Sequence, residues 1–154
     1  MPYDSRFSRM LHLLIHLGRH DGPIPSGLLA RMLSTNPVVV RRMMAGLREA
    51  GLVASGRGQG GGWTLARDLS EITLLDVHTA LGSPAIFAIT IAEDDPRCLV
   101  EQAVNAKLSD TLAEVEALLL SRFGAVSLAD IAGDFDRRMA QYGGAWAPPA
   151  ASRT

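Results

Sequence analysis

The sequence contains a single cysteine, Cys98, and only 5% of its residues are aromatic. One cysteine cannot form a disulfide within the chain, and it cannot supply the several thiolates of a zinc or iron–sulfur site in one subunit. No apolar run approaches the roughly 20 residues that cross a bilayer. Charged residues also interrupt the N-terminal segment where a signal peptide would need an apolar stretch. These absences predict a cytoplasmic protein without a membrane partner, with a core built mainly from aliphatic side chains.

Net charge is also nearly absent, but the charges are unevenly distributed. The 154 residues carry a net charge of -1 and suffice for one domain, or for a small domain with an added dimerisation element. Residues 1–69 hold nine arginines and four acidic residues, which gives +5, whereas the remainder holds six basic and twelve acidic residues, which gives -6. A polyanion would therefore be attracted only to the N-terminal half.

Short helices are predicted at the start of the chain. Apolar side chains at helical spacing cover about residues 5–20, and Asp21-Gly22-Pro23 ends this helix. A second short helix begins at Pro25 and Ser26, with Ser26 as a candidate N-cap. Such a pair of helices is typical of the first part of a helix-turn-helix motif.

A third helix follows as the candidate recognition helix. Asn36 can cap it, Pro37 suits its first turn, and Gly51 closes it. The first part of a recognition helix meets base edges, so Arg41 and Arg42 are the candidates for the groove; arginine binds guanine through two hydrogen bonds. Alternatively, these arginines merely solvate the helix surface. The side chains predicted to face the core are Val39, Val40, Met43, Met44 and Leu47.

A glycine-rich loop between two short strands follows this helix. Residues 52–55 and 63–65 are the predicted strands, and Arg57 is the single cation of the loop at residues 56–62. The glycine spacing matches GxGxxG, but a nucleotide-binding loop would need a following helix, and here a strand follows. A hairpin wing is favoured, with Arg57 suited to a minor groove. The full predicted DNA-binding set is Ser34, Thr35, Asn36, Val38, Arg41, Arg42, Arg48, Arg57, Gly58 and Gln59.

The predicted fold is mainly α with a small β-wing, a winged helix-turn-helix over residues 1–82 with its wing at 52–66. Thr73 and Asp76 form a capping-box-like start for a fourth helix that ends near Gly82. A connecting or sensor loop spans 83–96, with an apolar segment at 86–91 that is a strand or extended. Dimerisation helices are predicted within 97–142, over about 97–123 and 127–139, before a disordered tail at 143–154.

The long helix carries apolar residues at a spacing close to that of a coiled-coil seam. Such a helix after a small DNA-binding unit favours pairing of two subunits. Packing on its own domain is the alternative, because one amphipathic face does not identify the partner that covers it. The predicted dimer contacts are Val104, Leu108, Leu112, Val115 and Leu119.

Several segments together resemble a known family. The segments LREAGLV at 47–53, GRGQGGGW at 56–63 and LARD at 65–68 resemble the Rrf2 family of bacterial winged-helix regulators, the group of IscR, NsrR and CymR. The similarity extends to NPVVVRR at 36–42 and LLDV at 74–77, and it covers the chain to about residue 140. An arginine followed by a triple glycine and an aromatic residue is the specific part.

The resemblance implies a homodimeric transcription regulator, often a repressor, that binds double-stranded DNA as an inverted repeat. Each recognition helix would lie in a major groove and each wing in a minor groove. By position, Val38, Arg41 and Arg42 fall at the base-reading part of the helix, and Arg57 falls at the wing arginine. Gln59 stands where the family usually has proline.

The cysteine content separates this chain from cluster-binding members of that family, which carry three cysteines before the long helix. Only Cys98 is present, at the third place, so the resemblance implies a cysteine-poor branch without an iron–sulfur cofactor. Cys98 has three open interpretations: a small buried hydrophobe, a redox sensor at a helix start beside Arg97, or part of a metal site with His12, His16 or a carboxylate from the other subunit.

His12, His16 and His20 share one helix stripe, which could hold a metal. A partly solvated face is favoured because nothing nearby completes a tetrahedral set, so no metal site is predicted. The leading function is a homodimeric, sequence-specific DNA-binding regulator with Cys98 as a candidate sensor. The rival is a ligand- or protein-binding module that keeps the fold without binding DNA. No enzyme is predicted, because no motif places a nucleophile beside a base.

Overall fold

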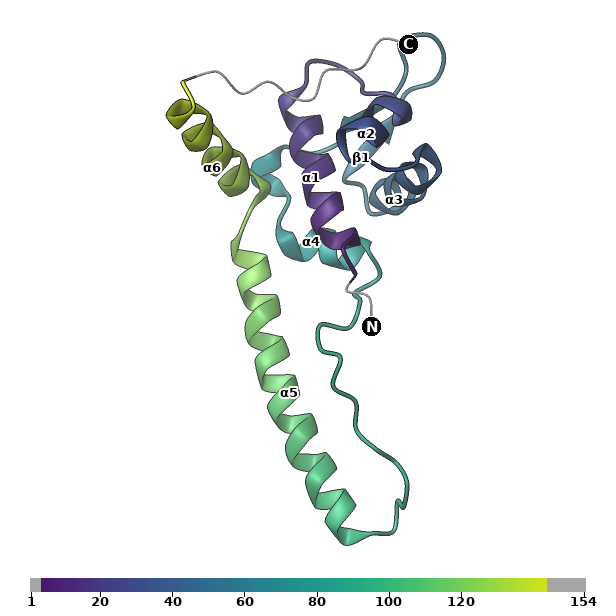
Figure 1. Cartoon of the computed structure of the whole chain (residues 1–154), viewed down its shortest axis with the longest axis vertical. Helices are drawn as coiled ribbons and strands as arrows, with labels where there is room; N and C mark the ends of the chain where they lie inside the picture. The colour runs from purple at the N-terminus through teal and green to yellow at the C-terminus, as the bar shows by residue number, and fades with distance from the viewer. Residues whose placement is uncertain (1–3, 144–154) are drawn as a thin grey trace.

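The computed structural model describes residues 4–143 and shows a helical body from which one long helix projects (Figure 1). A two-stranded antiparallel sheet is the β-structure of these residues. The predicted mainly α fold with a β-wing is confirmed. The elements are α1 (Arg6–Arg19), α2 (Ser26–Met32), α3 (Pro37–Glu49), β1 (Val53–Ser55), β2 (Trp63–Leu65), the 3-10 turn η1 (Leu69–Glu71), α4 (Leu74–Ala80), α5 (Leu99–Ala125) and α6 (Leu128–Gln141).

The body is organised around an aliphatic core that helices α1 to α4, the hairpin and the start of α6 share. Removing such side chains from water is the main favourable term in folding. Trp63 is the aromatic residue of this core, and the other members are aliphatic or methionine, as the small aromatic content predicted. Fully buried members include Leu13, Leu14, Ile24, Leu29, Val40, Met44, Leu47, Leu52, Ile72, Val77 and Leu128.

Side-chain caps fix where several helices begin. The Oδ1 atom of Asn36 accepts a hydrogen bond from the backbone N–H of Val38 at 2.8 Å, which confirms the predicted cap of α3. Thr73 and Asp76 form a capping box at α4, also as predicted. The prediction for α2 was wrong, because Pro25 is its N-cap and Ser26 is its first residue. The Ser26 hydroxyl instead accepts a hydrogen bond from Nε1 of Trp63 at 2.9 Å.

The wing is a tight hairpin in which Val53 pairs with Leu65 and Ser55 with Trp63. Its loop is closed by a hydrogen bond from Gly56 N–H to the Gly62 carbonyl at 2.8 Å. A Cβ at Gly62 would stand 2.7 Å from the backbone of Ile24, so a side chain there would displace the neighbouring segment. Backbone hydrogen bonds of 2.9 and 3.0 Å between Trp63 and Ile24 attach the wing to the start of α2.

Helix α5 differs from the other long helices in having no buried residue. It contacts α4 near its C-terminal end and otherwise projects from the body (Figure 1). The loop that precedes α5 runs alongside this helix in the opposite direction. A 2.8 Å hydrogen bond from the Asn105 side chain to the Ala92 carbonyl connects the two. Within this loop residues 86–91 form neither helix nor strand. Helix α6 then returns to pack against α1 and η1.

The helix boundaries differ from the predictions by two residues or fewer at α5 and α6. Val39 was predicted to face the core but is 37% exposed, because Val40, Met43 and Leu47 turn the buried face of α3 away from it. Residues 144–154 of the predicted disordered tail lie outside the described residues. Among residues 4–143, no helix is both long enough and apolar enough to cross a membrane.

Candidate nucleic-acid interface

The turn between α2 and α3 places the start of α3 at the surface. The backbone N–H of Thr35 bonds to the Ala30 carbonyl at 2.8 Å, and Ser34 takes a left-handed conformation with φ of 51°. Ser34 and Asn36 are exposed, whereas Thr35 is half-buried. Ser34 and Asn36 can therefore contact a ligand, whereas Thr35 mainly stabilises the turn.

The exposed face of α3 combines apolar and guanidinium groups. Its buried residues Val40, Met43 and Leu47 fix the helix on the core. On the opposite side Val38 is 48% exposed, and Arg41 and Arg42 are exposed one turn further along. Valine methyl groups suit the thymine methyl, and arginine suits guanine O6 and N7 in the major groove.

The N-terminal end of α3 has no acidic residue in its first turn. The positive end of the helix dipole therefore favours a phosphate there, although the Val38 N–H already donates to Asn36 and Pro37 carries no N–H. Arg41 and Arg42 are exposed on the same helix, so base and phosphate contacts could be made together.

Arg57 lies exposed in the wing loop, as do Gly58 and Gln59. The loop is ordered by its own backbone, since Gly61 N–H bonds to the Gly58 carbonyl at 3.0 Å. A Cβ at Gly61 would stand 2.7 Å from the Gly56 carbonyl oxygen. The consecutive glycines therefore permit a narrow loop that presents one cation at its end.

Arg48 occupies a different position from the other predicted arginines. It lies in the last turn of α3, where its guanidinium stands 5.9 Å from the centre of the Trp63 ring and 3.5 Å from the Ser55 hydroxyl. This placement holds the wing against α3. Arg48 is thus a positioning residue in this structure, and a DNA contact by its guanidinium remains a prediction.

Trp63 joins three segments that are distant in the sequence. Its ring is nearly buried, its Nε1 donates to Ser26 of α2, and its backbone pairs with Ile24. Sequence reasoning treated Trp63 only as a strand residue and missed this role. An aromatic residue directly after three glycines was the available signal.

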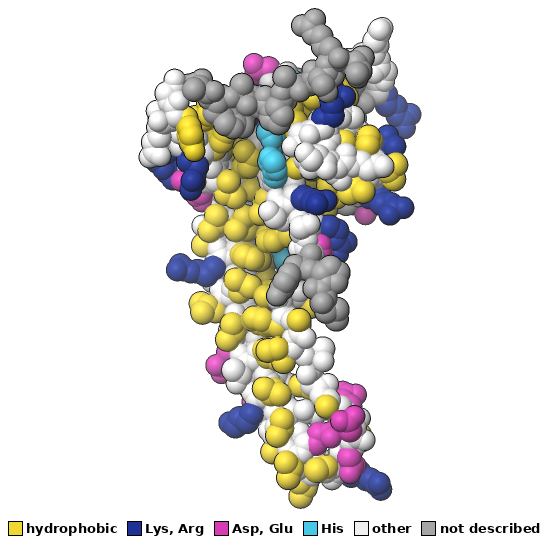
Figure 2. Space-filling view, in the orientation of Figure 1, with side chains coloured by type: hydrophobic (Ala, Val, Ile, Leu, Met, Phe, Trp, Pro, Cys, Tyr) yellow, Lys and Arg dark blue, Asp and Glu magenta, His cyan; other side chains and the backbone are white. Residues whose placement is uncertain are grey.

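The charged side chains are separated along the molecule. Figure 2 shows Lys and Arg side chains around much of the body and a few along the arm, whereas Asp and Glu gather mainly near the tip of the α5 arm. The acidic residues in that region are Glu93, Asp94, Asp95 and Glu101. The α3 and wing surface is therefore the part of this protein that suits a polyanion.

Cys98 precedes α5 as its N-cap residue and makes no side-chain capping bond. The thiol is half-buried, so Cys98 does not belong to the buried core that one interpretation required. Helix α1, which carries His12 and His16, lies at the opposite end of the molecule from the start of α5 (Figure 1). Cys98, His12 and His16 of one chain therefore lie too far apart to bind the same metal ion.

Comparisons with known proteins agree with this geometry. Residues 3–134 match the profile of the Rrf2 family, described as an iron-dependent transcriptional regulator. YwnA of Bacillus subtilis (strain 168), provisionally named an HTH-type transcriptional regulator, is 29% identical over 128 residues, which are 83% of this chain and 95% of YwnA.

Solved structures share the fold. A crystal structure provisionally described as a DNA-binding protein has a TM-score of 0.68 and 29% identity, with 82% of this chain and 98% of that chain covered. CymR, the global cysteine regulator of B. subtilis, has a TM-score of 0.58 and 24% identity, with coverages of 86% and 97%. The CymR likeness supports the winged-helix architecture alone.

The iron in the family description can be tested against the donor atoms present. Cys98 is the only cysteine of the sequence, and residues 4–143 contain no cluster of three or more His, Cys, Asp or Glu side chains placed to bind a metal. A cysteine-ligated iron–sulfur cluster needs several thiolates. The residues of one subunit therefore do not fit such a cluster.

Proposed function

Because this chain belongs to the Rrf2 family of transcriptional regulators, we propose that it is a homodimeric, sequence-specific DNA-binding protein that represses transcription from an inverted repeat. In each subunit α3 enters a major groove and the wing enters the adjacent minor groove. Residues 1–82 read DNA, residues 83–96 connect, and the helices within 97–142 include the dimerisation element. The protein acts in the cytoplasm and catalyses no reaction.

The observation that carries this function is the exposed surface of α3. The side chains of Val38, Arg41 and Arg42 are exposed and do not pack in the core. The first turn of the same helix contains no acidic residue. The same body presents Arg57 from a loop that its glycines make narrow. Apolar and guanidinium groups on a helix, followed by a lone cation in a wing, match the chemistry of the two grooves.

Dimerisation is supported by the exposure of the α5 seam. Val104, Leu108 and Val115 are 51%, 40% and 47% exposed, which is costly for side chains that carry no polar group. Leu112 and Leu119 are half-buried. The apolar surface continues beyond the predicted seam, because Leu99, Val100 and Leu118 are also exposed. Figure 2 shows hydrophobic side chains along the length of this arm.

The test is selection of bound duplexes from a random DNA pool by the reduced full-length protein, followed by affinity measurements at fixed salt. Arg41→Ala should weaken binding about 10-fold and relax the preference at one base position, since a bidentate arginine contributes about 1–3 kcal/mol of discrimination. Arg57→Ala should weaken binding mainly at A·T-rich flanks. Arg137→Ala, which removes an exposed arginine paired with Asp134 on α6, is the control and should bind as the wild type.

An inverted repeat among the selected duplexes supports a dimeric reader. No enriched sequence, together with affinities that ignore salt, would overturn DNA binding and leave the ligand- or protein-binding module as the function. Repression is tested by transcription in vitro from a promoter that carries the selected repeat. A rise in transcript on addition of the protein contradicts it.

Cys98 is proposed as the sensor of this regulator. The half-buried thiol at the first residue before α5 is accessible at the point where the loop turns into the arm. Mild oxidation should weaken DNA binding by the wild type and leave Cys98→Ser unchanged. Equal responses of the two proteins would make Cys98 structural.

A further inference from the structure

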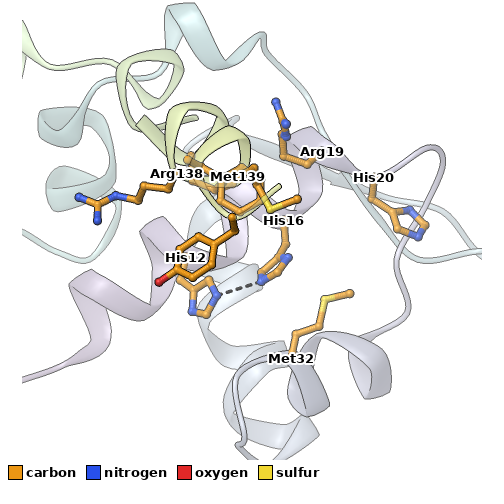
Figure 3. A pocket seen from close by; sticks show the side chains of 10 residues that line it. His12, His16, Arg19, His20, Met32, Arg138 and Met139 are labelled. Atoms are coloured by element: carbon orange, nitrogen blue, oxygen red, sulfur yellow. Dashed lines mark hydrogen bonds between the residues drawn. The ribbon is translucent and has the colours of Figure 1, made fainter. Parts of the chain in front are cut away.

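A cavity of about 650 Å³ lies where the DNA-reading body meets α6. Helix α1 forms its floor, α2 contributes Met32, and α6 contributes Phe135, Arg138 and Met139. Figure 3 shows the His12 and His16 rings between α6 on one side and Met32 on the other. Nothing in the proposed DNA or dimer contacts uses this cavity.

The two imidazoles in this cavity face each other. They lie one helical turn apart on α1, and their Nε2 atoms are separated by 2.9 Å (Figure 3). The rings are 4.7 Å apart between centroids, with an interplanar angle of 34°. The two Nε2 atoms share a hydrogen bond, so without a metal one imidazole donates to the other.

That separation fits two adjacent ligands of one metal ion. Metal–imidazole bonds of about 2.0–2.1 Å put two nitrogens about 2.8–3.0 Å apart when the angle between the bonds is 90°. A tetrahedral angle with the same bond lengths requires about 3.3–3.4 Å. Square-planar and tetragonal sites with nitrogen ligands are typical of Cu(II) and Ni(II). An ion that replaces the hydrogen-bonded proton would therefore require the smallest movement of the two rings in a square-planar or tetragonal site.

The surroundings are compatible with a cation. Arg19 and Arg138 line the cavity, but Arg19 pairs with Asp136 and the Nε of Arg138 lies 2.7 Å from Asp134. His12 is exposed and His16 is half-buried, and in its neutral form each ring can donate a lone pair to a metal. Both guanidiniums are neutralised by carboxylates, so the cavity offers little to a free anion.

We propose that His12 and His16 form a binding site for a Cu(II) or Ni(II) ion, with its remaining coordination positions open to the cavity. Two protein ligands leave room for water or for a small molecule that carries a donor atom, and the cavity volume accommodates such a molecule. The thioethers of Met32 and Met139 stand in the cavity wall as soft donors. This proposal goes beyond the partly solvated face that the sequence predicted for the histidine stripe, in which His12 is exposed and His16 is half-buried.

The proposed metal site does not depend on the proposed DNA binding, so an experiment can contradict one proposal without contradicting the other. The experiment uses the untagged full chain in a buffer that does not chelate, titrated with CuSO4 or NiCl2 by calorimetry. Low-temperature EPR of the copper sample counts the coordinating nitrogens. Four proteins are compared: the wild type, His12→Gln, His16→Gln and His20→Gln. The matched control is His20→Gln, because His20 lies one turn further along α1 and its ring contacts the Gly22 carbonyl instead.

One ion per chain is expected, with at least two nitrogen ligands. His12→Gln and His16→Gln should each weaken binding about 10-fold or more, whereas His20→Gln should bind as the wild type. A synthetic peptide of residues 5–20 is the second comparison. It should bind at least 10-fold more weakly, because the folded chain holds the two rings in place before the metal arrives.

Three outcomes would overturn the site. Equal loss in all three variants would show several weak surface contacts, and equal affinity of the peptide would show adventitious chelation without a contribution from the fold. No saturable binding by the wild type would exclude the site directly. Circular dichroism of each variant separates a lost ligand from a lost fold.

Discussion

The body and the α5 arm use similar apolar residues in opposite ways. In the body, helices such as α3 place Val40, Met44 and Leu47 in a shared core with full burial. In the arm, Val104, Leu108 and Val115 remain exposed, and no residue of a 27-residue helix is buried. Amphipathic spacing alone therefore predicts that a face is covered, and it does not predict whether the cover lies in the same chain.

With the proposed dimer, this difference places stability mainly in the body and subunit association mainly in the arm. The body buries its aliphatic side chains in one shared core, and transfer from water is worth about 25 cal/mol for each Å² removed. The arm has no buried residue, although its C-terminal end packs on α4 and places Phe123 against Phe7 and His78. Changes in the body should alter the free energy of unfolding, and changes in the arm should alter the association of subunits.

The largest expected effect is a core truncation. Leu47→Ala removes a fully buried side chain and should lower the free energy of unfolding by about 2–5 kcal/mol. Val104→Ala on the arm should change it much less at concentrations where the chain is monomeric. Urea denaturation followed by circular dichroism measures both. Similar losses in the two variants would contradict the separation of roles.

The second effect concerns association. Leu108→Asp puts a charge in the middle of the exposed α5 seam and should raise the dissociation constant of the proposed dimer about 100-fold or more, because each dimer loses two apolar contacts worth about 1.5–3 kcal/mol each. Sedimentation equilibrium measures the constant. Lys107→Asp, which changes charge beside the seam, is the control. A stable dimer of Leu108→Asp would remove α5 from the interface.

The third effect tests how the wing is attached to the body. Gly62→Ala would place a Cβ 2.7 Å from the Ile24 backbone and should cost about 1–3 kcal/mol of stability, comparable to other strained backbone positions. Gly60→Ala meets no atom within 4 Å and is strained only by its φ of 82°, so it should cost about 1–2 kcal/mol. Thermal denaturation ranks the two. Equal costs would show that the Ile24 contact is unimportant.

The smallest effect is a pH dependence of the body. Burial lowers the pKa of His12 and His16 below the ordinary value of 6.5. As the pH falls below about 6.5, the unfolded chain binds protons first, so folding stability decreases until the folded histidines also titrate. His16→Gln should reduce the change in melting temperature between pH 7 and pH 5. His20→Gln is the control and should leave this pH dependence as in the wild type. A slope that survives His16→Gln assigns the effect to other groups.

Features determined by neighbouring residues were predictable from the sequence. Asn36 and Thr73 cap their helices as expected, because an N-cap bond reaches only two or three residues along the chain. The glycine hairpin was also predicted, since its loop closes on itself. The recognition-helix arginines lie exposed, as their position opposite the apolar residues indicated.

Features that depend on distant residues were not predictable in the same way. Ser26 was read as a cap, but its partner Trp63 lies 37 residues further along. Arg48 was placed with the DNA-binding arginines, whereas its guanidinium lies over the Trp63 ring. Spacing put His12 and His16 on one stripe, but only the three-dimensional arrangement shows a cavity closed by α6. Each of these contacts joins segments whose approach no local pattern encodes.

The absence of buried residues in α5 has an evolutionary consequence. Substitutions on its seam can be accepted or rejected by selection without endangering the folding of the body that carries α3. Under the proposed function, duplicated copies of such a gene could therefore diverge in subunit choice while retaining the same operator. Residues of the core could not change so freely, because each supports several elements at once. Pairing preference is thus expected to evolve faster than the fold.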